Sequence, residues 1–201
     1  MLFGLFQGLT AKPGNYLKTN MQIVPTKIPD VWVIEPDLRG DDRGFFMETF
    51  RESHFRERGV VSRFLQDNQS RSGQGTLRGL HYQHKFPQGK LVRVLAGEVY
   101  DVAVDLRKNS ATFGQWVGEY LNAKTHKQLW VPPGFAHGFY VLSEIADLSY
   151  KCTDYYHPED EFSLRWDDAD LAIRWPLLDD RPLLSDKDRA AKSFKEIPAF
   201  Q

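Results

Sequence analysis

The stretch VYDVAVDL, residues 99–106, decides the fold class of this chain. Its even-numbered side chains share one face and its odd-numbered side chains share the other. Alternation with a period of two is typical of a β-strand, and we predict a strand here with one buried face. The three residues before it, Ala96-Gly97-Glu98, favour a hairpin turn from the preceding apolar segment.

Similar short segments, rich in valine, threonine and aromatic residues, recur along the chain between glycine, proline and aspartate. The predicted strands are residues 31–35, 45–50, 90–95, 99–106, 116–121, 129–131 and 147–155. Two stretches predict helices: residues 52–58, which Gly59 ends, and residues 185–194, where Ser185 and Asp188 resemble a capping box. Many short strands and few helices predict an all-β jelly-roll sandwich or barrel, with a few short helices of which one is C-terminal.

Composition narrows the function classes. The 201 residues carry a formal net charge of −1, with 41% hydrophobic and 26% charged residues, which is ordinary for a soluble globular protein. Nucleic-acid and membrane-surface binding favour a basic excess, so we expect neither. The single cysteine, Cys152, excludes an internal disulfide and indicates a reducing, cytoplasmic setting.

The first twenty residues differ from the rest in composition. They contain a short apolar run interrupted by Gly4 and Gly8, with no basic segment before it. This pattern does not fit a signal peptide, and the run is too short to span a bilayer. We predict an N-terminal extension of unknown role over residues 1–20 and a single domain over residues 21–201.

Two motifs each carry one histidine. LRGLHYQ, residues 77–83, contains His81, and WVPPGFAHGF, residues 130–139, contains His137. Metal-binding jelly rolls of the cupin type use His-x-His in the first motif and a further histidine in the second. Here Gln83 replaces the second imidazole, and glutamine is a weak ligand for transition metals, so we predict no bound metal. Two histidines that only fill a core remain an alternative.

Polar residues close to His81 in the sequence weigh against that alternative. Arg78 and Lys90 flank it, and Gln66-Asp67-Asn68 follows an apolar pair. Burying such side chains is costly unless a ligand satisfies them. We therefore predict a site for an anionic small molecule at the mouth of the jelly roll.

The same motifs also carry a family resemblance. LRGLHYQ, followed by GKLVRVLAGEVYDVAVDLRKNSATFGQW and LWVPPGFAHGFYVLSE, resembles the dTDP-4-dehydrorhamnose 3,5-epimerases, and the resemblance extends from Thr26 to Ala191. It implies a cupin jelly roll without a metal or other cofactor, usually a homodimer, that acts on dTDP-4-dehydro-6-deoxyglucose.

The resemblance also implies roles for individual residues. His81 resembles the general base, Asp188 the carboxylate that orients it, Tyr150 the general acid, and Lys90 the lysine near the C4 oxygen of the sugar. Tyr156 resembles a tyrosine that stacks on the thymine. The substrate-binding positions that the resemblance implies are Arg43, Glu48, Gln66, Asn68, Arg78, His137, Tyr156, Glu161 and Lys187.

The chemistry of a 4-keto sugar explains why such residues are needed. The hydrogens on C3 and C5 are acidic, and removing either one leaves an enolate with negative charge on the C4 oxygen. Inversion requires a base, a cation beside that oxygen and a proton donor on the opposite face. This chemistry, together with the family resemblance, predicts inversion of both C3 and C5, which would give dTDP-4-dehydro-β-L-rhamnose.

Several alternatives stay open at this point. The chain could be a relative that inverts only C3 or only C5, a metal-dependent cupin, or a sugar-nucleotide-binding module without catalysis. Asp188 could only cap a helix, Tyr150 could be a buried strand tyrosine, and Arg43 and Arg78 could form surface ion pairs.

Overall fold

The computed structural model describes residues 20–60 and 63–201. The predicted extension, residues 1–20, lies outside this part of the chain except for its last residue. The elements are β1 (Gln22–Pro25), β2 (Trp32–Glu35), β3 (Leu38–Asp41), β4 (Gly44–Met47), α1 (Glu52–Arg56), β5 (Gln66–Gly73), β6 (Leu77–Gln83), β7 (Lys90–Ala96), β8 (Glu98–Asp105), β9 (Trp116–Asn122), β10 (Gln128–Val131), β11 (Phe135–Val141), β12 (Ile145–Cys152), a 3-10 turn (Pro158–Asp160), β13 (Glu161–Ser163) and α2 (Asp186–Arg189). None of the described helices is long and apolar enough to cross a bilayer.

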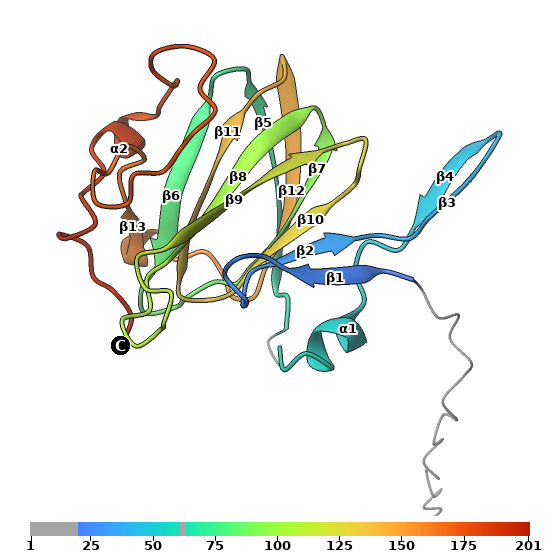
Figure 1. The fold of residues 1–201 in the computed structure, drawn as a ribbon, viewed down its shortest axis with the longest axis horizontal. Coiled ribbons are helices and arrows are strands. Elements are labelled where there is room, and N and C mark those ends of the chain that lie inside the picture. The colour runs from blue at the N-terminus through green and yellow to red at the C-terminus, as the bar shows by residue number, and fades with distance from the viewer. Residues whose placement is uncertain (1–19, 61–62) are drawn as a thin grey trace, which may run out of the picture.

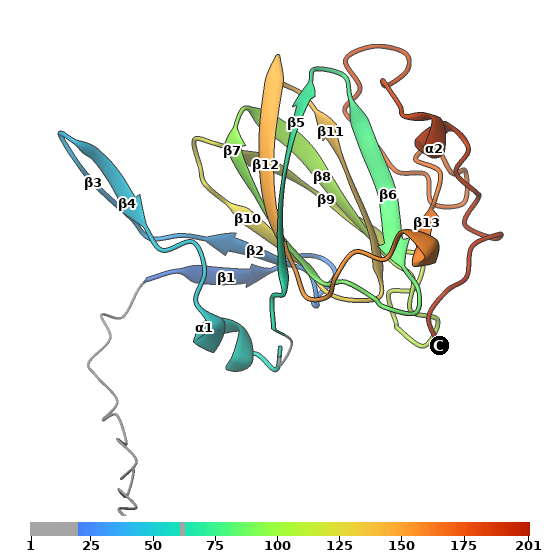
Figure 2. The ribbon, with the colours of Figure 1, turned by 180° about the vertical axis from the view of Figure 1, so that it is seen from behind.

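The strands form two facing antiparallel sheets (Figure 1). One has six strands in the order β1-β2-β10-β7-β12-β5, and the other has five in the order β13-β6-β11-β8-β9. Strands β3 and β4 form a separate hairpin, which projects away from the sandwich in both views (Figures 1 and 2). The predicted all-β jelly-roll architecture is confirmed.

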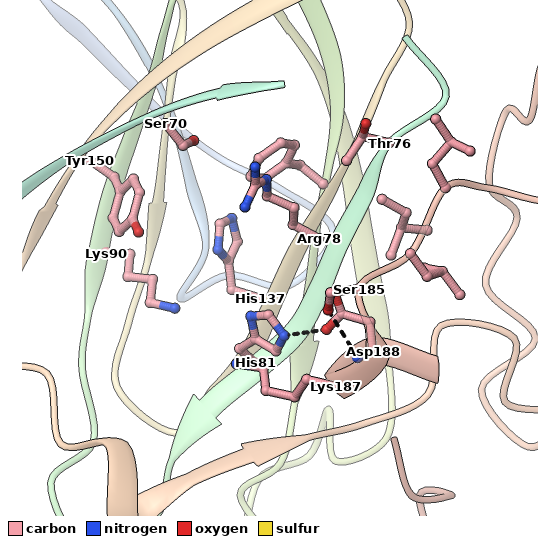
Figure 3. Close-up of a pocket in the computed structure, with 14 residues that line it drawn as sticks. Ser70, Thr76, Arg78, His81, Lys90, His137, Tyr150, Ser185, Lys187 and Asp188 are labelled. Carbon is pink, nitrogen blue, oxygen red and sulfur yellow. Dashed lines mark hydrogen bonds and ion pairs between the residues drawn. The ribbon is translucent and has the colours of Figure 1, made fainter. Parts of the chain in front are cut away.

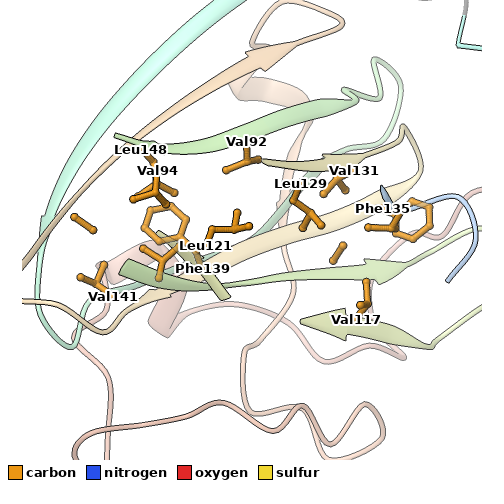
Figure 4. Close-up of a cluster of buried hydrophobic side chains, with 14 of the residues drawn as sticks. Val92, Val94, Val117, Leu121, Leu129, Val131, Phe135, Phe139, Val141 and Leu148 are labelled. Atoms are coloured by element: carbon orange, nitrogen blue, oxygen red, sulfur yellow. The ribbon is translucent and has the colours of Figure 1, made fainter. Parts of the chain in front are cut away.

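Apolar side chains from both sheets meet in the space between them (Figure 4). Val92 and Leu148 of the six-stranded sheet and Val117 and Phe139 of the five-stranded sheet belong to this cluster. Burying a side chain of this size stabilises the fold by about 1.5–3 kcal/mol. The cluster therefore fixes how the two sheets face each other.

Strand β8 differs from the prediction because both of its faces are buried. Val99 and Ala103 point into the core between the sheets. Val102 and Val104 pack instead in a second apolar cluster, which includes Leu171 and other residues of the C-terminal segment. The prediction of one buried face is wrong because this segment covers the outer face of the five-stranded sheet.

The turn at Gly97 is not a hairpin. Strand β7 pairs with β10 and β12 in one sheet, whereas β8 pairs with β11 and β9 in the other. The chain therefore crosses between the sheets at Gly97, which has φ +78°. A Cβ added there would lie 2.0 Å from the carbonyl oxygen of Ile145, so the crossing needs glycine.

The two predicted helices exist, and both are shorter than predicted. Helix α1 ends near Gly59, which has φ +83°, and the Val60 N–H donates to the Phe55 carbonyl across this turn. Helix α2 spans only Asp186–Arg189. It stops early because the following chain leaves to pair with the end of β13, where the Lys192 N–H donates to the carbonyl of Ser163, the last residue of that strand, at 3.1 Å.

Strands β6 and β11 approach each other closely at two glycines. Gly79 has φ +131°, and a Cβ on it would lie 2.5 Å from the Cα of Gly138. A Cβ on Gly138 would lie 2.7 Å from the Arg78 carbonyl oxygen. The register between the two strands also shifts just after His137. The glycine pair thus sets the spacing of the strands that carry both motif histidines.

We expect Gly138→Ala to lower the free energy of unfolding by about 1–3 kcal/mol, because the added methyl group forces β6 and β11 apart. Chemical denaturation monitored by tryptophan fluorescence measures this change. Gly73→Ala is the matched control, since a Cβ there lies 3.9 Å from its nearest neighbour. Equal unfolding midpoints for the two variants would contradict this account.

Candidate active site

A cavity of about 460 Å³ lies between strands of both sheets, and Figure 3 shows the side chains around it. Arg78 and His81 reach it from β6, and His137 reaches it from β11. Lys90 on β7 and Tyr150 on β12 line it from the opposite sheet. The segment around α2 closes one side.

A second cavity of about 280 Å³ shares His81, Lys90 and Tyr150 with the first. The two cavities bring together most of the predicted site residues, although these are scattered over the sequence. The predicted residues that line one or both are Gln66, Asn68, Arg78, His81, Lys90, His137, Tyr150, Tyr156, Glu161, Lys187 and Asp188.

A carboxylate from α2 holds the His81 ring. Nε2 of His81 lies 2.6 Å from Oδ1 of Asp188, and the histidine side chain is 22% exposed. The hydrogen-bond network assigns the tautomer with hydrogen on Nε2, which donates to Asp188. Nδ1 is turned toward the cavity (Figure 3) and lies 3.9 Å from Oε1 of Glu161. The ring therefore has one anchored nitrogen and one that can accept a proton.

Asp188 is almost fully buried yet ionised. Burial disfavours its charge, but the hydrogen bond and the attraction from His81 outweigh burial and lower the pKa of Asp188. The atom that caps α2 is Oγ of Ser185, which accepts the Asp188 N–H at 3.2 Å. The Asp188 carboxylate itself contacts His81 and Ser185, so it does more than start a helix.

Lys90 and Tyr150 lie on one face of the six-stranded sheet. Lys90 pairs with Cys152 across β7 and β12, and Tyr150 stands two residues before Cys152. Burial lowers the pKa of Lys90 and raises the pKa of Tyr150. The phenol thus keeps its proton at neutral pH, and both groups face His81 across the cavity (Figure 3).

A second histidine–carboxylate pair lies beside the first. Asp101 on β8 is completely buried, and its Oδ1 lies 2.7 Å from Nε2 of His137. His137 and His81 are direct cross-strand neighbours. Sequence reasoning missed the role of Asp101. The available signal was a carboxylate between two apolar residues, Val99 and Ala103, on one face of a predicted strand.

The cavity side of β5 is polar along its length. Gln66 and Asn68 line the second cavity, where Nε2 of Gln66 donates to Oδ1 of Asn68 at 2.9 Å. Ser72 accepts a hydrogen bond from Nε of Arg78 at 2.8 Å. The buried Oγ of Ser70 has no hydrogen-bond partner among the described residues. This strand offers donors and acceptors to a polar ligand, and sequence reasoning missed both serines.

Glu161 joins a residue of helix α2 to a residue of the loop after β12 at the outer edge of the site. It accepts hydrogen bonds from Nζ of Lys187 at 2.6 Å and from the Tyr156 hydroxyl at 2.9 Å. Burial opposes its ionisation, but Lys187 and His81 together hold its pKa below the ordinary value. Tyr156 is half exposed, so its ring face remains open to a ligand.

Arg43 and Glu48 do not join the other predicted residues in this chain. Arg43 lies in the projecting β3–β4 hairpin, where its side chain is 90% exposed and pairs with Asp41. Glu48 follows β4 and accepts a hydrogen bond from Nε of Arg51 at 2.8 Å. Neither residue lines the two cavities.

Gln83, at the position of the missing imidazole, is fully engaged in holding loops. Its amide nitrogen donates to the carbonyls of Phe86 and Tyr155, and its amide oxygen accepts the His157 N–H at 2.8 Å. Over residues 20–60 and 63–201, no three His, Cys, Asp or Glu side chains are grouped as metal ligands.

Comparisons with known proteins agree with this geometry. The family model described as dTDP-4-dehydrorhamnose 3,5-epimerase matches residues 25–196. A relative of that name from Pseudomonas aeruginosa is 55% identical over 181 residues, which are 90% of this chain and 99% of the relative. Two solved structures are informative about specificity. The dTDP-6-deoxy-D-glucose-3,5-epimerase from Legionella pneumophila, in complex with dTDP-4-keto-L-rhamnose, is 56% identical with a TM-score of 0.86 over 90% of this chain and 99% of that chain.

A 3'-monoepimerase from Streptomyces bikiniensis, in complex with dTDP-quinovose, is 36% identical with a TM-score of 0.77 over 85% of this chain and 86% of that chain. The shared fold therefore includes enzymes of both specificities, and the Legionella double epimerase is more similar to this chain than the Streptomyces monoepimerase is. From the extent of these matches, the chain belongs to the dTDP-4-dehydrorhamnose 3,5-epimerase family.

Proposed function

We propose that the protein converts dTDP-4-dehydro-6-deoxy-α-D-glucose to dTDP-4-dehydro-β-L-rhamnose by inverting C3 and C5. The observation that carries this proposal is the placement of His81, anchored by a buried carboxylate, across one cavity from Lys90 and Tyr150. Inversion needs a base and an acid on opposite sides of the sugar ring, and this cavity provides both. The higher identity to the Pseudomonas and Legionella 3,5-epimerases than to the Streptomyces monoepimerase favours inversion at two centres.

The reaction begins with proton removal by His81. Nδ1 takes the hydrogen from the carbon beside the ketone, and the electron pair moves into the enolate. Asp188 accepts a hydrogen bond from Nε2 and stabilises the imidazolium that forms. A positioned general base of this kind contributes about 10²–10⁴-fold to the rate.

Lys90 stabilises the charge that develops on the C4 oxygen. Its ammonium group is buried in the cavity wall, and none of the described side chains accepts a hydrogen bond from it. A cation in such a setting interacts more strongly with an oxyanion than it would in water. The lysine is thus already in place before the charge forms.

Tyr150 returns a proton to the opposite face of the carbon. Its raised pKa keeps the phenol protonated at neutral pH, as a donor requires. The proton taken by His81 exchanges with water, because the ring is partly exposed to solvent. The inverted carbon receives the hydroxyl hydrogen of Tyr150, and the tyrosinate that remains takes a proton back from water, so each inverted centre carries a hydrogen that comes from the solvent.

The remaining predicted residues bind the nucleotide and the sugar. Arg78 and Lys187 supply positive charge for the diphosphate, and the exposed ring face of Tyr156 is suited to stacking on the thymine. Gln66 and Asn68 present amides to the second cavity. We assign these roles from side-chain chemistry together with the position of each residue.

Arg43 and Glu48 have a role in this proposal only if the protein is a homodimer. The hairpin that carries Arg43 projects from its own sandwich and exposes Phe45 and Phe46 by 57% and 72%. Exposed aromatic side chains on a projecting hairpin are suited to burial against a second copy. We propose that the hairpin of one chain completes the site of the other.

We also place the enzyme in the cytoplasm, since its buried Cys152 is a free thiol.

Solvent deuterium separates the two halves of the proton-transfer mechanism. In deuterated water the wild type should place deuterium at both C3 and C5, as followed by NMR of the sugar nucleotide. His81→Asn should lower turnover by about 10²–10⁴-fold because the base is lost. Tyr150→Phe should retain exchange of substrate hydrogens and lose inversion, since His81 still removes the proton.

Other labelling patterns would favour the alternative functions. Deuterium at a single carbon would indicate a monoepimerase, and binding without any exchange would indicate a non-catalytic module. Stoichiometric iron, zinc or manganese in the purified protein, with activity lost to a chelator, would indicate a metal-dependent cupin.

The lowered pKa of Lys90 predicts how activity depends on alkaline pH. The cation is lost as pH rises through a value below that of an ordinary lysine, while Tyr150, with its raised pKa, is still protonated. Turnover should therefore fall in this range. Lys90→Gln should be slower by about tenfold or more and lack this fall. Lys151→Gln, which removes a partly exposed lysine paired with Asp67, is the control and should keep the wild-type profile.

Mixed dimers test the sharing of the hairpin. Arg43→Ala and His81→Asn each inactivate one half of a shared site, so each variant alone should have low activity. When the two chains are mixed, one site of each heterodimer combines an intact pocket with an intact hairpin. Activity should then recover toward one quarter of the wild-type value, as expected for random pairing with roughly half of the dimers mixed. No recovery in heterodimers would mean that the hairpin does not serve the partner's site.

A further inference from the structure

Ser185 lies directly behind the histidine–carboxylate pair. Its hydroxyl donates to Oδ2 of Asp188 at 2.8 Å. Oγ of Ser185 also accepts a hydrogen bond from the Asp188 N–H at 3.2 Å. Ser185 also lines the cavity beside Asp188 (Figure 3). The serine thus contacts the carboxylate oxygen that His81 does not.

Each oxygen of the Asp188 carboxylate has its own partner. Oδ1 receives the hydrogen bond from His81, and Oδ2 receives the one from Ser185. Asp188 is 4% exposed, so with both partners in place its carboxylate has almost no contact with water. A buried carboxylate oxygen without a donor is costly, and the carboxylate would turn to relieve it. Turning it would move Oδ1 away from the imidazole.

We propose that Ser185 is a positioning residue for the epimerisation, which holds the Asp188 carboxylate and thereby aims Nδ1 of His81 at the substrate carbon. This inference rests on the proposed function of the His81–Asp188 pair. The serine touches neither the base nor the reacting carbon in this arrangement. It acts through the carboxylate.

A simpler role for Ser185 is to cap α2. That helix has only four residues, and the chain around it is held at both ends without the cap. Before the helix, Leu183 exchanges backbone hydrogen bonds with Gly75 and Leu77 at 2.8 and 3.0 Å. After the helix, Lys192 bonds to Ser163. The segment therefore has anchors that do not involve the serine hydroxyl, and the hydrogen bond to Oδ2 has a separate purpose.

The hydrogen bond also affects the charge of Asp188. His81 on β6 and Lys187 on α2 face this carboxylate, and Glu161 on β13 lies beyond the imidazole. The other charged residues that line the surface hollow beside Asp188 are Arg165, Asp167, Asp180, Arg181 and Arg189. Burial raises the pKa of Asp188, and the bonds from His81 and Ser185 lower it. Removing the hydroxyl raises the pKa of Asp188. As pH is lowered, the Asp188 carboxylate of the variant therefore takes up a proton at a higher pH than that of the wild type.

Three substitutions separate positioning from capping. Ser185→Thr keeps both hydrogen bonds. Ser185→Gly removes the hydroxyl but leaves a residue that is tolerated at a helix start. Ser185→Ala removes both functions. We expect kcat of the Gly and Ala variants to fall about tenfold or more, with KM within about twofold, because a hydrogen bond to a charged group is lost. The acid limb of their pH–activity profile should also lie at a higher pH than that of the wild type. Ser185→Thr should have the wild-type kcat and the wild-type acid limb.

Ser110 provides a matched control. Its hydroxyl donates to Oδ2 of the buried Asp105 at 2.7 Å and accepts the Thr112 N–H at 3.1 Å, outside both cavities. Ser110→Ala therefore removes the same kind of contact from a carboxylate without a catalytic role. It should lower thermal stability and leave kcat and the pH profile unchanged.

The outcomes distinguish this inference from the proposed function. If the wild type incorporates no deuterium at C3 or C5, the proposed function fails. If the wild type is active and Ser185→Gly and Ser185→Ala keep its kcat and acid-side profile, the positioning role is wrong. The role is also wrong if their losses disappear at a temperature where thermal unfolding shows every variant to be folded.

Discussion

The contact between Nε2 of His81 and the buried carboxylate of Asp188 is the interaction on which the site depends. It joins an element of the five-stranded sheet to a four-residue helix more than 100 positions later in the chain. A charged oxygen in so enclosed a position is stable only when its partners are fixed. The surrounding serine, backbone anchors and strand pairings all restrict those partners. In the proposed mechanism, the fold thus orients the His81 imidazole before any substrate arrives.

Each of the two facing sheets contributes a different set of side chains to the site. The histidines come from β6 and β11, whereas the lysine and the phenol come from β7 and β12. Buried cations, imidazoles and carboxylates would destabilise a simple sandwich core. Here they gather at one end of the space between the sheets, and the apolar cluster occupies the rest. This separation lets one small domain contain both a stable core and a reactive cavity.

Local sequence patterns predicted the positions of strands better than they predicted which strands pair with one another. Alternation in residues 99–106 identified β8, but no local signal indicates that Gly97 leads into the other sheet. β5 was missed because its sequence, QDNQSRSG, contains no apolar residue. Family motifs located His81 and Tyr150, whereas the contact of Asp101 with His137 joins residues 36 positions apart and appears only in three dimensions. For the same reason, the sequence did not indicate where the hairpin of Arg43 would project.

Phe139 belongs both to the cluster between the sheets and to the wall of the cavity. The cavity therefore borders the apolar core directly, with no further layer of side chains between them at this ring. Close-packed interiors transmit small changes in volume to their neighbours. A change in core packing at Phe139 would therefore change both the stability of the fold and the shape of the cavity. Adaptation of this enzyme to a different temperature would have to preserve the size and position of this side chain.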